Sequence, residues 1–383
     1  MNINKIFLII KIIIKTILNS KKIYGYPSKN KIIILDSYSI RIIKYFLIPK
    51  ESFTLLDLKR REIYVPIFIK SIFFIFKYGK YAYEVLFIKY VNPRIAITYI
   101  DNNHYYFTIF SFIKNSLLIM IQNGNLASNR KDIKSIPIKN RKCDYYFVLN
   151  NLSKNFFQKK CKIISNYIIA GSQEANINRL NFNTKKKIDE ITLVSYFRKK
   201  DNYDPNFYNN FHVKPIFFIR NVLKKYLRNN KMKFNILLVS NENEEKEFFD
   251  KMFNSIKFHY IENDRNKIFK NSYKALNSNT IYIGDSKLLT ECLGLGYKIL
   301  FFSIRGHYIN DSSYEFGWPY HTNKFGDFWL NYPNEQKAIN ILSNIINIEL
   351  KDWRRILIKY KDFHHFNYEN KNTIKVIKKL INN

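Results

Sequence analysis

Cysteine, glycine, proline and acidic residues are all scarce in this chain of 383 residues. The three cysteines, Cys143, Cys161 and Cys292, include no CxxC pair, and their odd number argues against a disulfide framework. No His/Cys spacing of the kind that holds structural zinc is present either. The sequence therefore predicts a protein of a reducing, cytoplasmic compartment that uses neither a metal nor another cofactor.

The shortage of acidic residues gives the chain a strong positive charge. There are 30 Asp and Glu against 64 Lys and Arg, and the formal net charge is +34, as in many nucleic-acid-binding proteins. The positive residues are spread along the chain, however, and the abundant Lys, Ile, Asn, Tyr and Phe all share A/T-rich codons. Genome composition is the simpler cause, so we expect a solvated basic surface and no specific nucleic-acid partner.

Long uninterrupted apolar runs are also absent. Residues 6–18 are apolar except for Lys11, Lys15 and Thr16; the run is too short to span a bilayer, and no small-residue cleavage site follows it. One interpretation is an amphipathic helix packed on the protein. The other is a basic amphipathic helix that makes a peripheral contact with the inner face of the membrane. A second run, 67–76, is shorter still and is interrupted by Lys70.

Apolar strand patterns alternate with helical patterns along the first half of the chain. Strands are expected at 31–36, 94–100, 116–121, 145–149 and 166–170, with a mainly helical stretch at 40–90 and a helix at 105–114. This alternation predicts βαβ units around a parallel sheet, and such sheets bind ligands at the carboxyl ends of their strands.

The pattern restarts after a polar, lysine-rich segment near 180–189. Strands are expected at 190–198, 234–240, 258–261 and 280–283, helices at 215–229 and 244–253, and a helical end at 336–380. The predicted fold class is α/β, with two Rossmann-like domains facing across a cleft. We predict domains at 1–182 and 190–345, and a helical segment at 346–383.

One stretch, 281–329, is the most informative. It begins as a strand, a tight turn and a short helix, with the N-cap residue types Asp285 and Ser286 at the turn and Gly294 and Gly296 to end the helix. A helix N-terminus at the carboxyl end of a parallel strand presents backbone N–H groups and a positive dipole end, which suit a phosphate or diphosphate.

Polar residues follow the expected strands of the first half as well. Asp101 and His104 are candidates for a general base, although an Asp at this position commonly caps the next helix. Gly124 is expected to adopt an unusual turn. Further along, Arg198 ends a strand and can bind phosphate bidentately or remain a solvated surface arginine. The histidines His212, His259, His364 and His365 have no partner constellation and are expected to be structural or exposed.

An ordered set of motifs resembles a known family across roughly residues 30–345. The motifs are Asp101-Asn102-Asn103, Gln122-Asn123-Gly124, Ile169-Ala170-Gly171-Ser172, the segments 193–198 and 285–291, Phe302-Ser303-Ile304-Arg305, Phe316-Gly317-Trp318-Pro319 and Gly326-Asp327-Phe328-Trp329. The chain resembles the bacterial surface-carbohydrate biosynthesis transferases, which are glycosyltransferases of the two-domain GT-B type.

The resemblance implies an activity and a distribution of roles. A transferase of this type moves a sugar, or a polyol-phosphate unit, from a nucleotide-activated donor to a glycan or glycolipid acceptor, here a surface polysaccharide or lipopolysaccharide precursor, and no metal is obligatory. The donor would lie in the C-terminal domain (190–345), and the acceptor would approach from the N-terminal domain (1–182). Ser286 and Thr290 would lie near the phosphate. Glu291 would bind the ribose, unless Glu291 is an ordinary helix-surface residue. The other implied binding residues are Asn102, Asn103, Gln122, Asn123, Gly124, Gly171, Ser172, Ser195, Arg198, Asp285 and Arg305.

Two points stay open at the level of sequence. The aromatic residues of 316–319 and 328–329 can stack on a sugar or base, or fill a core beside a rigid loop. The whole chain can also be a non-catalytic nucleotide- or nucleic-acid-binding protein that uses its basic surface, or a family member that acts as an assembly partner. Saturable binding of a nucleoside diphosphate would favour the transferase, and steeply salt-dependent nucleic-acid binding would favour the alternative.

Overall fold

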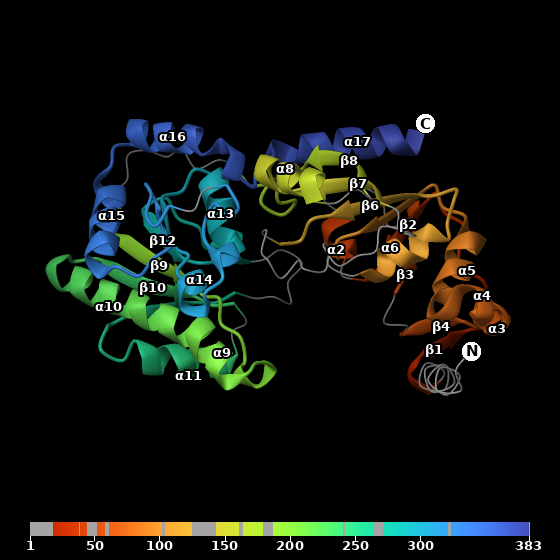
Figure 1. Ribbon diagram of the computed structural model, residues 1–383, viewed down its shortest axis with the longest axis horizontal. Coiled ribbons are helices and arrows are strands. Elements are labelled where there is room, and N and C mark those ends of the chain that lie inside the picture. Colours follow the sequence, from red (N-terminus) through yellow and green to blue (C-terminus); the bar gives the residue numbers. More distant parts are fainter. Residues whose placement is uncertain are drawn as a thin grey trace.

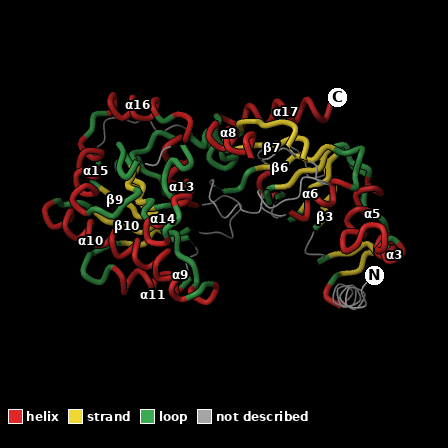
Figure 2. Tube along the Cα trace, in the orientation of Figure 1, coloured by secondary structure: helices red, strands yellow, loops and turns green. Residues whose placement is uncertain are grey.

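Two six-stranded parallel sheets form the centre of the molecule (Figure 1). The computed structural model describes residues 18–37, 39–43, 52–57, 61–101, 104–124, 143–160, 164–178, 187–239, 242–263, 271–320 and 323–382. In each half of the molecule, helices lie on both sides of the strands (Figure 2). The predicted α/β class is therefore confirmed.

The N-terminal sheet has the strand order β3-β2-β5-β6-β7-β8. Its strands are β2 (Ile32–Leu35), β3 (Phe53–Leu56), β5 (Ile95–Thr98), β6 (Leu117–Ile121), β7 (Cys143–Val148) and β8 (Ile164–Ile169). Every residue of β2 and β5 is buried, because helices cover both faces of the sheet. Alternate residues go to opposite faces: Ile33 and Leu35 join one apolar cluster, and Ile32 and Ile34 join the other.

The remaining elements of this half are mostly short. A parallel pair, β1 (Lys21–Ile23) and β4 (Glu62–Tyr64), lies beside the main sheet. The helices are α2 (Ile40–Ile43), α3 (Val65–Phe73), α4 (Ile75–Tyr78), α5 (Ala82–Val91), α6 (His104–Ser111) and α8 (Asn151–Lys160). The prediction of a mainly helical 40–90 is thus partly wrong, because β3 and β4 lie inside it. These strands are too short to show a clear period, and pairing with β2 and β1 determines their conformation.

The C-terminal sheet has the order β11-β10-β9-β12-β13-β14. Its strands are β9 (Glu190–Val194), β10 (Lys233–Leu237), β11 (His259–Ile261), β12 (Thr280–Gly284), β13 (Ile299–Phe302) and β14 (Trp329–Leu330). The helices around it are α9 (Pro205–Tyr208), α10 (Lys214–Asn229), α11 (Asn243–Met252), α12 (Asn271–Lys274), α13 (Lys287–Gly294), α14 (Arg305–Ile309), α15 (Glu335–Asn347) and α16 (Leu350–Lys359).

The chain crosses back to the first half at its C-terminal end. Trp353 and Leu357 of α16 belong to the core of the C-terminal sheet, whereas α17 (Lys371–Asn382) inserts Ile377 and Leu380 into an apolar cluster of the N-terminal sheet. Figure 1 shows α17 lying over β8. The predicted helical segment 346–383 therefore serves both halves of the molecule. The predicted domain boundaries themselves stay a prediction.

The two sheets turn the carboxyl ends of their strands toward each other. Ser172, just after β8, donates a hydrogen bond to Glu291 of α13 at 2.5 Å, and Lys287 of α13 donates one to the Asn123 carbonyl, just after β6, at 3.0 Å. The ring of Phe156 on α8 lies 5.3 Å from that of Trp318 in the second half. The expected arrangement across a cleft is therefore present. In the described part of the chain, every helix is too short or too polar to cross a membrane.

Candidate functional site

A cavity of about 480 Å³ lies at the carboxyl ends of β9, β10 and β12, and we call it the C-terminal cavity. All of its described lining residues belong to the second half of the chain. They include Ser195, Tyr196, Arg198, Phe211, His212, Tyr273, Asp285, Ser286, Lys287, Glu291 and Arg305. One cavity is thus lined by six residues that were expected from the sequence to bind the donor: Ser195, Arg198, Asp285, Ser286, Glu291 and Arg305.

The turn between β12 and α13 points a helix N-terminus into this cavity. β12 is fully buried and ends at Gly284. Its φ is +133°, and an added Cβ would lie 2.9 Å from the Val194 carbonyl oxygen, so a larger residue is excluded. Ser286 occupies the N-cap position, as predicted, but its side chain does not cap the helix. The first turn of α13 therefore has no side-chain cap and is open to an anionic ligand.

Asp285 binds Arg305 rather than capping the helix. The Arg305 Nε lies 2.6 Å from the Asp285 Oδ2, and the guanidinium also stacks on the rings of Tyr196 and Phe211. Burial lowers the pKa of Arg305, but the Asp285 carboxylate outweighs that effect and the net shift is upward. Arg305 is thus a fixed cation in the wall of the cavity, and α13 opens at the predicted turn with Ser286 at the N-cap position.

Three buried polar side chains in this cavity have no hydrogen-bond partner among the described residues. They are the Ser286 hydroxyl, the Tyr196 hydroxyl and both ring nitrogens of His212. Burial, followed by the charges of Arg305 and Arg198, lowers the pKa of His212 to about 4, so the imidazole is neutral at pH 7. Buried polar groups are almost always paired, so three unpaired groups in one cavity indicate a site for a polar ligand. His212 had been expected to be structural or exposed.

Glu291 is only 3% exposed, so the alternative of an ordinary helix-surface residue is wrong. Its carboxylate accepts hydrogen bonds from Ser172 at 2.5 Å and from Tyr273 at 2.6 Å, and it lies 3.4 Å from the Lys287 ammonium group. Each carboxylate oxygen has two acceptor sites, so Glu291 can still accept from a ligand. In this structure it also holds the two halves of the molecule together.

Ser195 and Arg198 follow β9 at the edge of the same cavity. The Ser195 hydroxyl donates to Glu245 at 2.5 Å, and the same Glu245 oxygen accepts from the Val239 amide. This local network fixes the loop after β9. Arg198 is exposed, and its guanidinium donates to the carbonyl of its neighbour Phe197. Its charge is therefore available at the cavity mouth.

The candidates of the N-terminal half do not line this cavity. Asp101 is 2% exposed and accepts a hydrogen bond from Tyr146 at 2.5 Å. His104 is the first residue of α6, and Asn102 and Asn103 lie outside the described residues. The structure brings neither Asp101 nor His104 to either of the cavities described here.

The loop after β6 is held by its own side chains and by α13. Gln122 donates to the Gly124 carbonyl and accepts from the Leu149 amide, and the Asn123 carbonyl accepts from Lys287. The unusual turn expected at Gly124 is absent, because Gly124 has no positive φ. Position 171, in contrast, requires a glycine, because its φ is +67° and an added Cβ would lie 2.7 Å from the Asn176 side chain.

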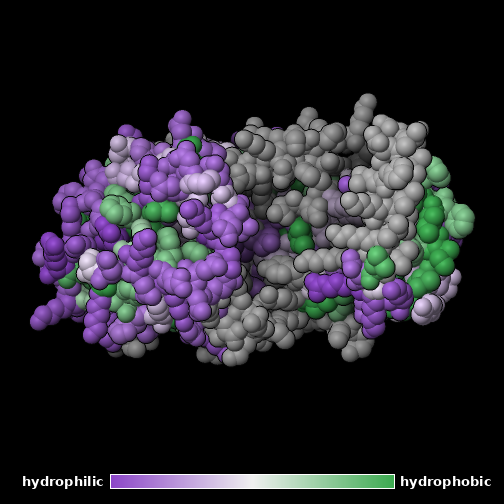
Figure 3. Space-filling view, turned by 90° about the horizontal axis from the view of Figure 1, so that it is seen from below, coloured by the Kyte–Doolittle hydropathy of each residue, from purple (hydrophilic) through white to green (hydrophobic). Residues whose placement is uncertain are grey.

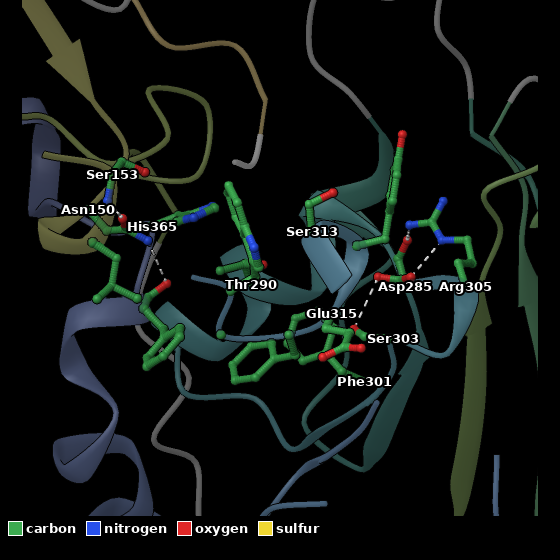
Figure 4. Close-up of a pocket in the computed structure, with 16 residues that line it drawn as sticks. Asn150, Ser153, Asp285, Thr290, Phe301, Ser303, Arg305, Ser313, Glu315 and His365 are labelled. Atoms are coloured by element: carbon green, nitrogen blue, oxygen red, sulfur yellow. Dashed lines mark hydrogen bonds and ion pairs between the residues drawn. The ribbon is translucent and has the colours of Figure 1, made fainter. Parts of the chain in front are cut away.

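A second cavity, of about 210 Å³, lies between the two halves, and we call it the interdomain cavity (Figure 4). Asn150, Leu152 and Ser153 line it from α8 and the residue before it. From the other half it is lined by Asp285, Thr290, Phe301, Ser303, Arg305, Ser313, Tyr314, Glu315, Phe316, Gly317, Trp318, Phe363 and His365. Asp285 and Arg305 line both cavities, so their ion pair forms the wall between them.

Two titratable groups of the interdomain cavity were not predicted as site residues. Burial lowers the pKa of His365 to about 3, and its Nδ1 has no hydrogen-bond partner in the described residues. Burial raises the pKa of Glu315, whose carboxylate forms no ion pair with a described residue. Nothing local in the sequence marks Glu315 or His365 as a site residue.

The aromatic residues of 316–329 divide between core and cavity. Phe328 and Trp329 are buried in the core of the second half. Phe316 and Trp318 line the interdomain cavity, and Trp318 also packs on Phe156 of the first half. The core alternative is therefore confirmed for Phe328 and Trp329, and stacking of Phe316 and Trp318 on a sugar or base stays a prediction.

Comparisons with known proteins agree with this architecture. A family model described as "putative O-antigen biosynthesis protein" matches residues 119–381, more than half of the chain. The comparison with curated proteins gave no match.

Several solved structures share the fold over nearly the whole chain. A structure described as "putative UDP-N-acetylglucosamine 2-epimerase" from Listeria monocytogenes has a TM-score of 0.54 and 11% identity, and covers 91% of this chain and 96% of its own. MnaA of S. aureus, solved with UDP, has a TM-score of 0.53 and 10% identity, with 92% and 97% covered. The UDP-GlcNAc 2-epimerase of Neisseria meningitidis, solved with UDP-GlcNAc, has a TM-score of 0.51 and 12% identity, with 91% and 98% covered. At these identities the likeness shows the fold, which is of the GT-B type.

Proposed function

Because the chain belongs to a family of O-antigen biosynthesis proteins, we propose that it is a metal-independent transferase. It moves a sugar, or a polyol-phosphate unit, from a nucleotide-activated donor to a surface polysaccharide or lipopolysaccharide precursor. The acceptor is a glycan or a glycolipid.

The observation that carries the proposal is the chemistry of the C-terminal cavity. Its volume of about 480 Å³ is within the range of small-ligand sites, roughly 300–1,000 Å³. The uncapped N-terminus of α13, the exposed Arg198 and the fixed Arg305 favour an anion. The unpaired Ser286, Tyr196 and His212 supply donors and acceptors to the rest of the ligand. A nucleoside diphosphate has both parts, and this is what supports a nucleotide-activated donor.

The interdomain cavity supports a place for the sugar and the acceptor. A donor whose diphosphate lies at α13 extends past the Asp285–Arg305 pair into that cavity. Trp318 and Phe316 offer apolar ring faces, while Ser153, Thr290 and the neutral His365 offer hydrogen bonds. Aromatic faces combined with neutral hydrogen-bonding groups suit a sugar ring.

The transfer itself needs a base and a stabilised leaving group. The acceptor oxygen forms a bond to the anomeric carbon, the bond from that carbon to the donor phosphate breaks, and the diphosphate departs with the electron pair. Arg198, Arg305 and the α13 N-terminus stabilise the departing charge. Asp101 and His104 remain candidates for the base that takes the acceptor proton. Glu315 is a further candidate, because it faces the interdomain cavity and its raised pKa makes it a stronger base.

A nucleotide-binding screen tests the proposal. UDP, CDP, GDP and their sugar conjugates are added to the full chain, and the melting temperature is followed. UDP is tested first because MnaA and the Neisseria enzyme were solved with UDP and UDP-GlcNAc. We expect one nucleotide series to stabilise the protein, and we expect Arg198→Ala to weaken its binding by roughly 10- to 100-fold.

Arg228→Ala is the matched control, because Arg228 is exposed on α10 and lines neither cavity. Nucleotide binding that is equal in both variants would remove the C-terminal cavity from the donor site. Binding with no transfer to any added glycan acceptor would favour the non-catalytic alternative, and a changed sugar without transfer would indicate an epimerase.

A further inference from the structure

The helices α3 and α4 expose a group of large apolar side chains. Ile67 and Phe68 of α3 are buried against the first half of the molecule. Its other side exposes Ile69, Ile72 and Phe73, and α4 adds Phe76, with exposed fractions of 52%, 40%, 77% and 81%. We call these four side chains the α3–α4 surface. Figure 1 places α3 and α4 at the end of the molecule away from the second half, and Figure 3 shows apolar residues gathered at that end.

Such a surface is unusual in a helix that covers a soluble core. A helix of a globular protein is polar on its outer face, whereas α3 is apolar on nearly all sides apart from Lys70 and Ser71. Contiguous exposed apolar side chains commonly mark an interaction site. The exposure of these side chains therefore indicates a partner with an apolar surface that accepts Ile and Phe.

The charge around the surface identifies the kind of partner. Lys70, Lys77 and Lys80 are exposed beside it, and no Asp or Glu occurs between Val65 and Tyr83. Neither Lys70 nor Lys77 forms an ion pair with a described carboxylate. An apolar centre with lysines beside it is complementary to a surface that is apolar inside and negative at its edge.

We propose that the α3–α4 surface docks on a membrane of anionic phospholipids. Phe73, Phe76 and the two isoleucines enter the boundary between headgroups and acyl chains, and the lysines remain among the phosphates. The contact is peripheral and spans nothing. This inference is independent of the proposed transferase activity, since none of these residues lines either cavity.

Vesicle co-sedimentation of the full chain tests the proposal. The vesicles contain phosphatidylethanolamine and phosphatidylglycerol in one series and phosphatidylcholine alone in the other. We expect binding to the anionic vesicles to fall more than tenfold in Phe73→Ser/Phe76→Ser. Each of Lys70→Glu and Lys77→Glu should lower binding by about fivefold or more, because one lysine near such a surface contributes about that factor.

The matched control is Phe217→Ser/Ile358→Ser, which removes two apolar side chains, 46% and 70% exposed, from α10 and α16 of the other half. It should bind vesicles like the unsubstituted protein, and both double variants should keep the melting temperature within a few degrees. A Phe73→Trp reporter should be quenched by brominated lipid, and an Ile358→Trp reporter should not.

The proposal is overturned if the protein ignores anionic vesicles, or if the two double variants bind equally. Equal binding to phosphatidylcholine would contradict the role of the lysines. A dimer that dissociates in Phe73→Ser/Phe76→Ser, without vesicle binding, would show that a second copy of the chain occupies the surface instead.

Discussion

Ser286, Tyr196 and His212 carry polar atoms that the fold buries without a hydrogen bond in the described part of the chain. A buried polar group without a partner costs about 1–3 kcal/mol. Such groups in one cavity are a cost to folding that binding of a polar ligand recovers. These unpaired groups therefore lower the stability of the folded protein while they favour ligand binding. A single substitution of one of them should raise the stability and weaken the binding.

We predict that His212→Phe stabilises the protein and makes its stability less dependent on pH. The pKa of His212 is about 4 in the folded protein, below its ordinary value of 6.5. The unfolded chain therefore binds the proton first, and stability is complete above pH 6.5 and falls as the pH drops toward 4. The loss amounts to roughly 3 kcal/mol. Urea unfolding of both proteins between pH 7 and pH 4 measures the difference, and parallel curves would contradict the buried neutral imidazole.

We predict a loss of turnover, without a loss of donor binding, in Glu315→Gln. The base must be deprotonated to act, so the rate of the unsubstituted enzyme should rise with pH through the raised pKa of Glu315. That limb of the pH profile should disappear in the variant. Asp101→Asn is the comparison: if it removes the limb and Glu315→Gln does not, the base is Asp101.

At the scale of elements, the turns after the strands position the site. The turn after β12 places the N-terminus of α13 at the C-terminal cavity, and the turn after β8 places Ser172 within hydrogen-bond distance of Glu291. In that second turn Gly171 has a φ of +67°, and an added Cβ would lie 2.8 Å from the Asn367 amide nitrogen. The turn is therefore packed against the segment that returns to the first half.

We predict that Gly171→Ala destabilises the protein by about 2–5 kcal/mol, from the left-handed backbone and the two close contacts together. Gly25→Ala is the control, because its φ is ordinary and an added Cβ has no described atom within 4 Å. It should change stability by less than about 1 kcal/mol. Chemical denaturation of both variants gives the comparison, and equal effects would mean that the turn adjusts freely.

At the scale of the whole molecule, the C-terminal end joins the two halves. After α16, the segment around His365 passes between them, with its carbonyl accepting from the Ser172 amide at 2.8 Å. α17 then covers one face of the N-terminal sheet. The two halves consequently share hydrogen bonds, the interdomain cavity and one returning helix, so a change in α17 should reach the first half directly.

We predict that Ile377→Ala costs about 2–5 kcal/mol, since Ile377 is 2% exposed in the cluster with Ile32, Ile95 and Ile119. Lys378→Ala, one residue further on the exposed side of the same helix, should stay within about 0.5 kcal/mol. Hydrogen exchange of β2 and β5 should rise only in the first variant. Unchanged exchange there would mean that α17 does not protect the sheet.

Sequence alone determined the parts that depend on local period. The apolar runs of β2, β5, β6, β9 and β12 predicted parallel strands, and the turn at 284–286 predicted the helix N-terminus that now lies in the C-terminal cavity. It failed at β3 and β4, where pairing rather than period sets the conformation. It also failed at Gly124, because the expected turn depends on a single dihedral angle.

Tertiary structure alone decided which distant residues meet. His212, Glu315 and His365 come from three separate segments, and only the packing of two sheets and a returning chain brings them to two adjoining cavities. Burial then shifts their pKa values and leaves ring nitrogens of the two histidines without a hydrogen-bond partner in the described part of the chain. Local sequence carries periodicity and turn chemistry, whereas desolvation and contact between remote segments exist only in the folded chain.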